Sequence, residues 1–182
     1  MLELIIPERE MFDARRQEFL YLKEQKLVLE HSLISLSKWE SKWKKPFLDK
    51  KQKTIEESID YVRCMLLNAK DVNPTVLTLL SDDIFSQIND YIEDSMTATW
   101  FNDKNQKKGG SGQIVTSELI YYWMVAFRIP FTCEKWHLNR LLTLIKVCEQ
   151  KNAPKKRMKR KDIYARNAAL NAARKSKYGS NG

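Results

Sequence analysis

The longest apolar and aromatic run in the chain lies between residues 116 and 150, and its hydrophobic positions recur at helical spacing. Its first half predicts a helix whose apolar side chains repeat every four residues. These side chains are Leu119, Trp123 and Phe127, with Ile120 and Met124 beside them. A short hydroxyl side chain at Thr116 or Ser117 is expected to cap this helix. Pro130 predicts that it ends near Arg128, because proline lacks an N–H and disfavours helical backbone before it.

A second helix is predicted to follow, with Thr132 as its N-cap and Glu134 in its first turn, where the helix dipole favours a negative charge. Its apolar positions follow the spacing of a core-facing helix. They are Leu138, Leu141, Leu142, Ile145 and Cys148. We expect this helical hairpin to form the centre of the fold.

The first thirty residues carry β-prone runs instead. Leu2–Pro7 predicts a short edge strand that is ended by proline. Two further runs, Glu18–Leu22 and Lys26–Glu30, are separated by three residues, which predicts a hairpin between them. A meander of two or three strands needs a cover for its apolar face, because small isolated hairpins are marginal in water.

Four segments between residues 33 and 93 carry helical periodicity and are joined by short connections. The first two expected helices run from about Leu33 to Lys44 and from Thr54 to near Asn68. A short third helix is expected to begin at Asn73-Pro74, and a fourth is expected to begin at a cap formed by Ser81-Asp82-Asp83. Thr54 and Glu57 match the capping-box pattern. The sequence therefore predicts an α+β fold, predominantly α, in which a short N-terminal β-meander or hairpin packs on a helical body of about six helices.

The net charge of +9 is concentrated at the C-terminus. Ten basic residues and one acid, Asp162, lie between Ala153 and Gly182, which leaves 22 basic and 22 acidic residues of the totals of 32 and 23 for residues 1–152. The ten are Lys155, Lys156, Arg157, Lys159, Arg160, Lys161, Arg166, Arg174, Lys175 and Lys177. We therefore predict a single α-rich domain over residues 1–152, with a flexible loop at 102–112, and a basic tail over 153–182 that is partly helical when supported.

The sequence contains no convergent set of catalytic or metal-ligating residues. Its two histidines, His31 and His137, have no metal-ligand spacing with a cysteine or a carboxylate, and we interpret both as structural. The phosphate-binding, dinucleotide-binding and zinc-protease motifs are absent, and GGSG at 109–112 is interpreted as a plain loop. We predict no enzyme, no cofactor and no metal.

The cysteine count and hydropathy bear on location. Cys64, Cys133 and Cys148 are odd in number and widely separated, which favours free thiols in a reducing compartment. No stretch approaches the ~18 consecutive apolar residues of a membrane span. We expect a soluble protein that does not associate with membranes.

Two features favour binding. Trp136 and Arg140 are one helical turn apart, and together with Trp123 they are the candidate partner-binding residues, because Trp and Arg are enriched at binding hot spots. The ten cations of the tail form a candidate electrostatic site. They fit nucleic-acid phosphates, an acidic protein, or a role in solubility alone.

Three segments carry a resemblance: VLEHSLISLSKWESKWKKPFL at 28–48, MTATWF at 96–101 and SELIYYWMVAFRIPFTCEKWHLNRLLTLIKVC at 117–148. They resemble small proteins that tailed bacteriophages encode among their virion morphogenesis genes and that look like tail assembly chaperones. The similarity covers most of residues 1–170, whereas the glycine-rich loop at 109–112 is not part of it.

The resemblance implies a virion assembly factor that binds the tape-measure protein, or tail-tube protein, in the host cytoplasm. It transfers no binding residue to this chain. A structural component of the virion tail or neck, and a nucleic-acid-binding protein that uses the basic tail, are the alternatives. Self-association is compatible with each of them.

Overall fold

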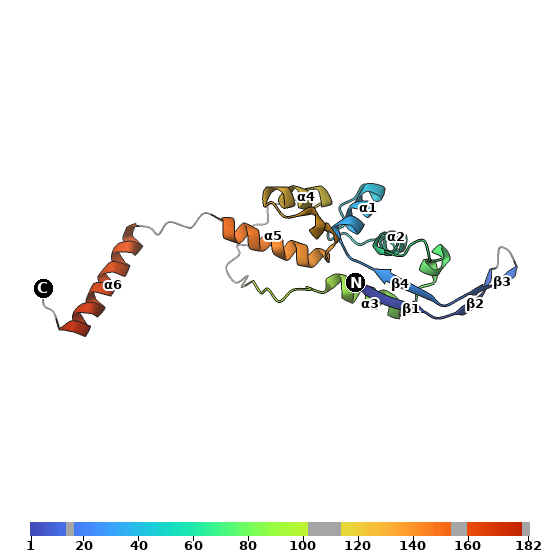
Figure 1. Ribbon diagram of the computed structural model, residues 1–182, viewed down its shortest axis with the longest axis horizontal. Coiled ribbons are helices and arrows are strands. Elements are labelled where there is room, and N and C mark those ends of the chain that lie inside the picture. Colours follow the sequence, from blue (N-terminus) through green and yellow to red (C-terminus); the bar gives the residue numbers. More distant parts are fainter. Residues whose placement is uncertain (14–16, 102–113, 154–159, 180–182) are drawn as a thin grey trace. The chain divides into compact units, whose positions relative to one another are not determined.

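The computed structural model describes residues 1–13, 17–101, 114–153 and 160–179 (Figure 1). The chain forms two compact units, Met1–Glu149 and Gln150–Gly182. The fold is α+β and predominantly α, as the sequence predicts, with an N-terminal β-hairpin followed by a helical body. The predicted loop at 102–112 lies outside the described residues.

The N-terminal strands form one long antiparallel ribbon. Strand β1 (Leu2–Ile6) pairs with β4 (Gln25–Leu29), and β2 (Arg9–Asp13) pairs with β3 (Glu18–Leu22). The predicted hairpin between the last two strands is therefore wrong, because β3 and β4 are consecutive parts of the same returning arm. The chain reverses between β2 and β3, where Gln17 has a positive φ of 54°.

The two pairs of strands share one register. Ile6 faces Gln25 and Arg9 faces Leu22, so two residues on each arm lie between the last pair of one sheet and the first pair of the other. Pro7 lies in this interval and has no N–H to donate, which accounts for an interruption of the ladder without a shift in pairing. The ribbon extends away from the helices, with β2 and β3 at its far end (Figure 1).

The other edge of β4 is covered by the segment that follows the second helix. The Leu67 N–H donates to the Val28 carbonyl at 2.9 Å, and the Glu30 N–H donates to the Met65 carbonyl at 3.0 Å. The Asn68 side chain accepts from the Val28 N–H at 3.1 Å and donates to the Lys26 carbonyl at 2.8 Å. This edge is thereby closed to further strand pairing.

Helices α1 (Leu33–Trp43) and α2 (Ile55–Met65) begin at capping boxes. Thr54 accepts from the Glu57 N–H, and Glu57 accepts from the Thr54 N–H at 2.9 Å, which confirms the predicted box. The two helices are also joined by the Trp39 indole, which donates to the Glu57 carbonyl at 2.9 Å. A 3₁₀ helix, η1 (Pro74–Leu79), and helix α3 (Asp82–Glu93) follow at the predicted positions.

The predicted helical hairpin has a different second half. Helix α4 (Ser117–Ala126) is followed by a 3₁₀ turn, η3 (Phe131–Lys135), and α5 (Leu138–Asn152) begins only at Leu138. Thr132 is therefore inside η3 and does not cap a helix. The reason is a contact with a distant segment: His137 forms an isolated β-bridge with Ser32, and the Leu138 N–H donates to the His31 carbonyl at 2.7 Å.

The core lies where α1, α4 and α5 meet the proximal half of the ribbon. Its fully buried members include Leu27, Leu33, Ile120, Leu138 and Leu141. Leu142 and Cys148 complete the predicted stripe of α5 as partly buried residues packed against this core. Cys64, Cys133 and Cys148 are free thiols.

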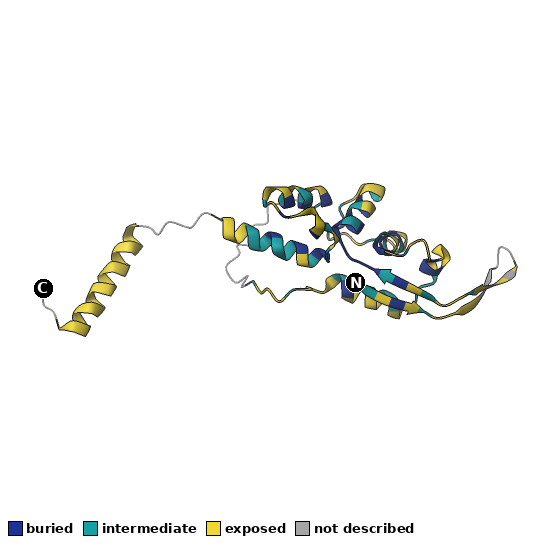
Figure 2. Cartoon of the chain, viewed as in Figure 1, coloured by how far each residue is buried: buried dark blue, intermediate teal, exposed yellow. Residues whose placement is uncertain are grey.

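The second unit contains helix α6 (Arg160–Tyr178), and each of its residues is exposed (Figure 2). This helix lies in the basic tail, which the sequence predicts to be partly helical when supported. Four of the ten basic residues predicted as an electrostatic site lie outside the described residues. These are Lys155, Lys156, Arg157 and Lys159.

Candidate protein-binding surface

Helix α4 is fixed at its first turn by a carboxylate from α1. The buried side chain of Glu40 accepts from the Ser117 N–H at 2.7 Å and from the Phe47 N–H at 2.8 Å. A negative charge at this position is favoured by the helix dipole. Thr116 is the N-cap residue, but its side chain makes no capping hydrogen bond. Glu40 therefore replaces the hydroxyl cap that the sequence predicts at Thr116 or Ser117.

The inward face of α4 is centred on Ile120 and Met124, which are both fully buried. Leu119, Trp123 and Phe127, predicted as the apolar face, are only partly buried and lie beside it. The buried face is thus displaced by one position along the sequence from the predicted one. Trp123, a candidate partner-binding residue, belongs to this partly buried flank.

The outward face of α4 is also apolar. Tyr122 and Val125 are three residues apart on the helix and are 65% and 61% exposed. Phe131 of η3 is 56% exposed, and its ring lies 6.3 Å from that of Tyr121. We call Tyr122, Val125 and Phe131 the α4 surface. The helix itself contains one charged residue, Glu118. A helix that is apolar all round is normally covered on every side, and here one side is not.

Tyr121 connects α4 with η3. Its hydroxyl donates to the Glu134 carboxylate at 2.9 Å, and burial together with this carboxylate raises the pKa of Tyr121 to about 12. The phenol is therefore a permanent donor at neutral pH. This bond holds the 3₁₀ turn that carries Phe131 against the helix that carries Tyr122 and Val125.

The structure brings the other two candidate residues together. The Arg140 guanidinium lies 4.3 Å from the centre of the Trp136 ring, a cation–π contact. The pair borders a cleft of about 270 Å³ whose other lining residues include Glu30, Tyr91 and His137. This volume falls just below the range typical of small-molecule sites. Trp123 lies on α4 and does not line this cleft.

The two histidines, which are far apart in sequence, form a buried pair. Their ring centres are 5.0 Å apart, in an edge-to-face arrangement. His31 Nδ1 and the Tyr61 hydroxyl share a hydrogen bond of 2.5 Å, and His137 Nε2 lies 2.9 Å from the Tyr91 carbonyl. Burial and, to a smaller extent, the neighbouring His137 together lower the pKa of His31 to about 3.

This cluster has the properties of a polar core element. Burial raises the pKa of Tyr61 and of Tyr91, whose hydroxyl donates to Glu30 at 2.8 Å. The neutral imidazole of His31 and the protonated phenols of Tyr61 and Tyr91 supply hydrogen bonds within the core but no activated nucleophile. The described residues contain no group of three or more His, Cys, Asp or Glu side chains that could hold a metal ion.

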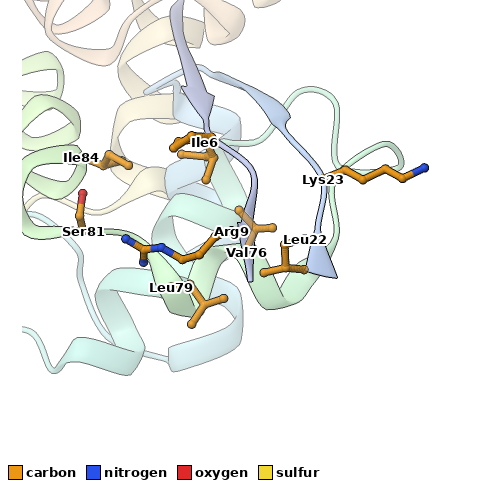
Figure 3. Close-up of a pocket in the computed structure, with 9 residues that line it drawn as sticks. Ile6, Arg9, Leu22, Lys23, Val76, Leu79, Ser81 and Ile84 are labelled. Carbon is orange, nitrogen blue, oxygen red and sulfur yellow. The ribbon is translucent and has the colours of Figure 1, made fainter. Parts of the chain in front are cut away.

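A small apolar groove lies between the ribbon and the helices that follow α2. It has a volume of about 80 Å³ and lies where the strand ladder is interrupted (Figure 3). Ile6 and Leu22 line it from the ribbon, and Val76 and Ile84 from η1 and α3, while Lys23 extends away from it. It is too small for an ordinary ligand.

Sequence reasoning missed the exposed apolar residues of α4 and η3. Tyr122, Val125 and Phe131 were part of an expected core hairpin. Trp100 is 93% exposed, whereas Trp39 is fully buried in the core. The signal for the α4 surface was present in the sequence, because a ten-residue helix with a single charge has no polar face to turn to solvent.

No protein-family model, no curated protein and no solved structure matches this chain. No described helix combines the length and the hydropathy that crossing a membrane requires.

Proposed function

We propose that this protein is a bacteriophage virion assembly factor that acts by binding another protein, in the manner of a tail assembly chaperone on the tape-measure protein. The observation that carries the binding role is the exposed α4 surface, with Tyr122, Val125 and Phe131 each more than half exposed. Aromatic residues of this kind dominate the energetics of protein interfaces. The phage assignment rests on the sequence resemblance.

The rigidity of the surface supports this role. Glu40 fixes the start of α4, and the hydrogen bond between Tyr121 and Glu134 fixes η3 beside it. The exposed side chains thus belong to elements that are held in place before a partner arrives, so that binding orders fewer groups. An extended helical client such as a tape-measure protein presents apolar side chains at helical spacing that such a surface can contact.

The test is co-expression with the tape-measure protein encoded by the same genome. We expect the client to remain soluble and to co-purify with the wild-type chain, and we expect Tyr122→Glu together with Val125→Glu to abolish both effects. Glutamate keeps the helix propensity of these exposed positions, so the fold should persist. The matched control is Ile55→Glu, at a position in the first turn of α2 that is 77% exposed.

Three outcomes would overturn the proposal. The first is a failure of the wild-type chain to bind or solubilise the client. The second is detection of the chain in purified virions by mass spectrometry, which would indicate a structural tail or neck component. The third is a dimer that the α4 double variant converts to monomers, because a second copy would then cover the surface.

A further inference from the structure

Every residue of helix α6 is exposed. It is 19 residues long, and none of these residues is buried. Most helices in proteins gain their stability from the tertiary packing of one face rather than from helix propensity alone. A sequence that encodes such a helix without a core contact is typical of a segment that is stabilised by binding.

Five polar or aromatic residues of α6 fall on one narrow strip of the helix. At about 100° per residue, positions separated by seven, four, three and four residues fall on one side of a helix. This spacing is found in Arg160, Asn167, Asn171, Arg174 and Tyr178. From Arg160 to Arg174 the strip therefore presents two amides and two guanidinium groups in a row about 21 Å long, at 1.5 Å per residue.

Further cations lie on both sides of this strip. Lys161 and Lys175, fourteen residues apart, fall within about 40° of each other on one flank. Arg166 and Lys177, eleven residues apart, fall within about 20° of each other on the opposite flank. The back of the helix carries no Lys or Arg and consists mainly of small residues. These are Ala165, Ala169, Ala172 and Ser176, with Asp162 among them.

A partner must therefore offer negative charge on two sides of the helix and hydrogen-bonding groups between them. The major groove of B-form DNA has this geometry, since it is about 12 Å wide, admits an α-helix and is bordered by phosphates on both sides. The flat face of an acidic protein would contact one flank of α6 only. A-form RNA has the phosphates, but its major groove is too narrow for side chains to enter.

We propose that α6 binds in the major groove of duplex DNA. Lys161 and Lys175 contact the phosphates of one strand, and Arg166 and Lys177 contact those of the other. The central strip faces the base edges, where Asn binds adenine and Arg binds guanine through paired hydrogen bonds. This function is independent of the α4 surface, which belongs to the other unit of the chain.

The test is fluorescence anisotropy of a labelled duplex DNA of random sequence, titrated with the full-length protein between 50 and 200 mM salt. Binding should weaken linearly on a log–log plot of affinity against salt, because each phosphate contact contributes about 0.9 to the slope. Lys161→Ala with Lys175→Ala, and separately Arg166→Ala with Lys177→Ala, should each reduce the slope by about 1.8. The control is Lys50→Ala with Lys70→Ala, which removes the same charge from exposed positions of the other unit.

A separate measurement of sequence preference tests the role of the central strip. Asn167→Ala with Asn171→Ala should leave the salt slope unchanged, and it should reduce by about fivefold or more the preference for sequences that the wild-type chain selects from a random duplex library. Circular dichroism of each variant compares its helical content with that of the wild-type protein.

The proposal is overturned if either flank variant retains the wild-type slope, since one-sided contact fits an acidic protein. It is also overturned if duplex RNA of the same sequence binds as tightly as the DNA, or if polyglutamate at equal charge displaces the DNA completely.

Discussion

The carboxylate of Glu40 accepts a hydrogen bond of 2.7 Å from the backbone N–H of Ser117 and so caps a helix that begins 77 residues further along the chain. The same carboxylate accepts from the Phe47 N–H at 2.8 Å. One buried side chain therefore connects α1, the segment after it and the start of α4. The position of the α4 surface depends on this connection.

Removal of this carboxylate should destabilise the fold strongly. Glu40→Ala leaves two buried N–H groups without an acceptor, and we expect a loss of about 2–4 kcal/mol in the free energy of unfolding. Glu40→Gln should cost less, because its single carbonyl oxygen still satisfies one donor. Urea denaturation followed by circular dichroism measures both. A loss below about 0.5 kcal/mol for Glu40→Ala would contradict the capping role.

The two N-caps at Thr54 and Ser81 should respond differently to the same substitution. Thr54→Ala removes a side-chain acceptor that the Glu57 N–H uses, and should cost about 1 kcal/mol. Ser81 makes no side-chain capping hydrogen bond, so Ser81→Ala serves as the matched control and should change stability by less than about 0.5 kcal/mol. Equal losses at the two positions would show that the hydroxyl hydrogen bond is not the cause.

Stability should fall in mild acid because of His31. The pKa of this residue is about 3 in the folded chain and has the ordinary histidine value of about 6.5 when it is exposed, so the unfolded state binds more protons between these values. The free energy of unfolding therefore rises with pH across this window. As the pH falls, the stabilisation that neutral His31 provides decreases by up to about 1.4 kcal/mol per pH unit.

The measurement is the unfolding free energy from pH 7.5 to 5, a range above the titration of ordinary carboxyl groups. His31→Gln should be less stable at pH 7.5, because it loses the hydrogen bond with Tyr61, but its stability should vary less between these pH values. A variant with the same pH slope as the wild-type chain would exclude His31 as the source.

The contact between Arg140 and Trp136 should be weakly cooperative. A double-mutant cycle with Arg140→Ala and Trp136→Ala should give a coupling of about 0.5–1 kcal/mol in the free energy of unfolding, as expected for a cation–π pair whose cation is exposed to solvent. Arg140→Lys tests the geometry, because an ammonium stacks less well on an indole than a planar guanidinium does. Zero coupling would show that the two residues are neighbours without an energetic connection.

The parts of the fold that the sequence predicts correctly depend on local patterns. The capping box of Thr54 and Glu57 involves residues three apart, and Pro74 begins its short helix as expected. The errors arise from distant contacts. Strand β3 pairs with β2 and not with β4, which no local pattern reveals. Helix α5 begins only at Leu138 because His137 forms a bridge with Ser32, a residue more than 100 positions away.

Part of the candidate site could likewise be predicted from the sequence, and part could not. The sequence predicts that Trp136 and Arg140 lie close together, and they do. The predicted reason is wrong, because Trp136 precedes the first residue of α5 and the two residues are not on consecutive turns of one helix. The α4 surface could not be assigned in advance, because a helix without a polar side gives no indication of which face is covered. That choice is made by Ile120 and Met124, which pack into a core formed by distant segments.

The continuous register of the ribbon has a consequence for engineering the protein. The proximal half carries the buried residues Leu4, Leu27 and Leu29, whereas the side chains described in β2 and β3 are partly or fully exposed. Because Ile6 faces Gln25 as Arg9 faces Leu22, equal lengths can be cut from both arms, and the remaining pairs keep their partners. The distal hairpin is thus a cassette that can be shortened, or replaced by another hairpin, without changing which faces of β1 and β4 meet the helices.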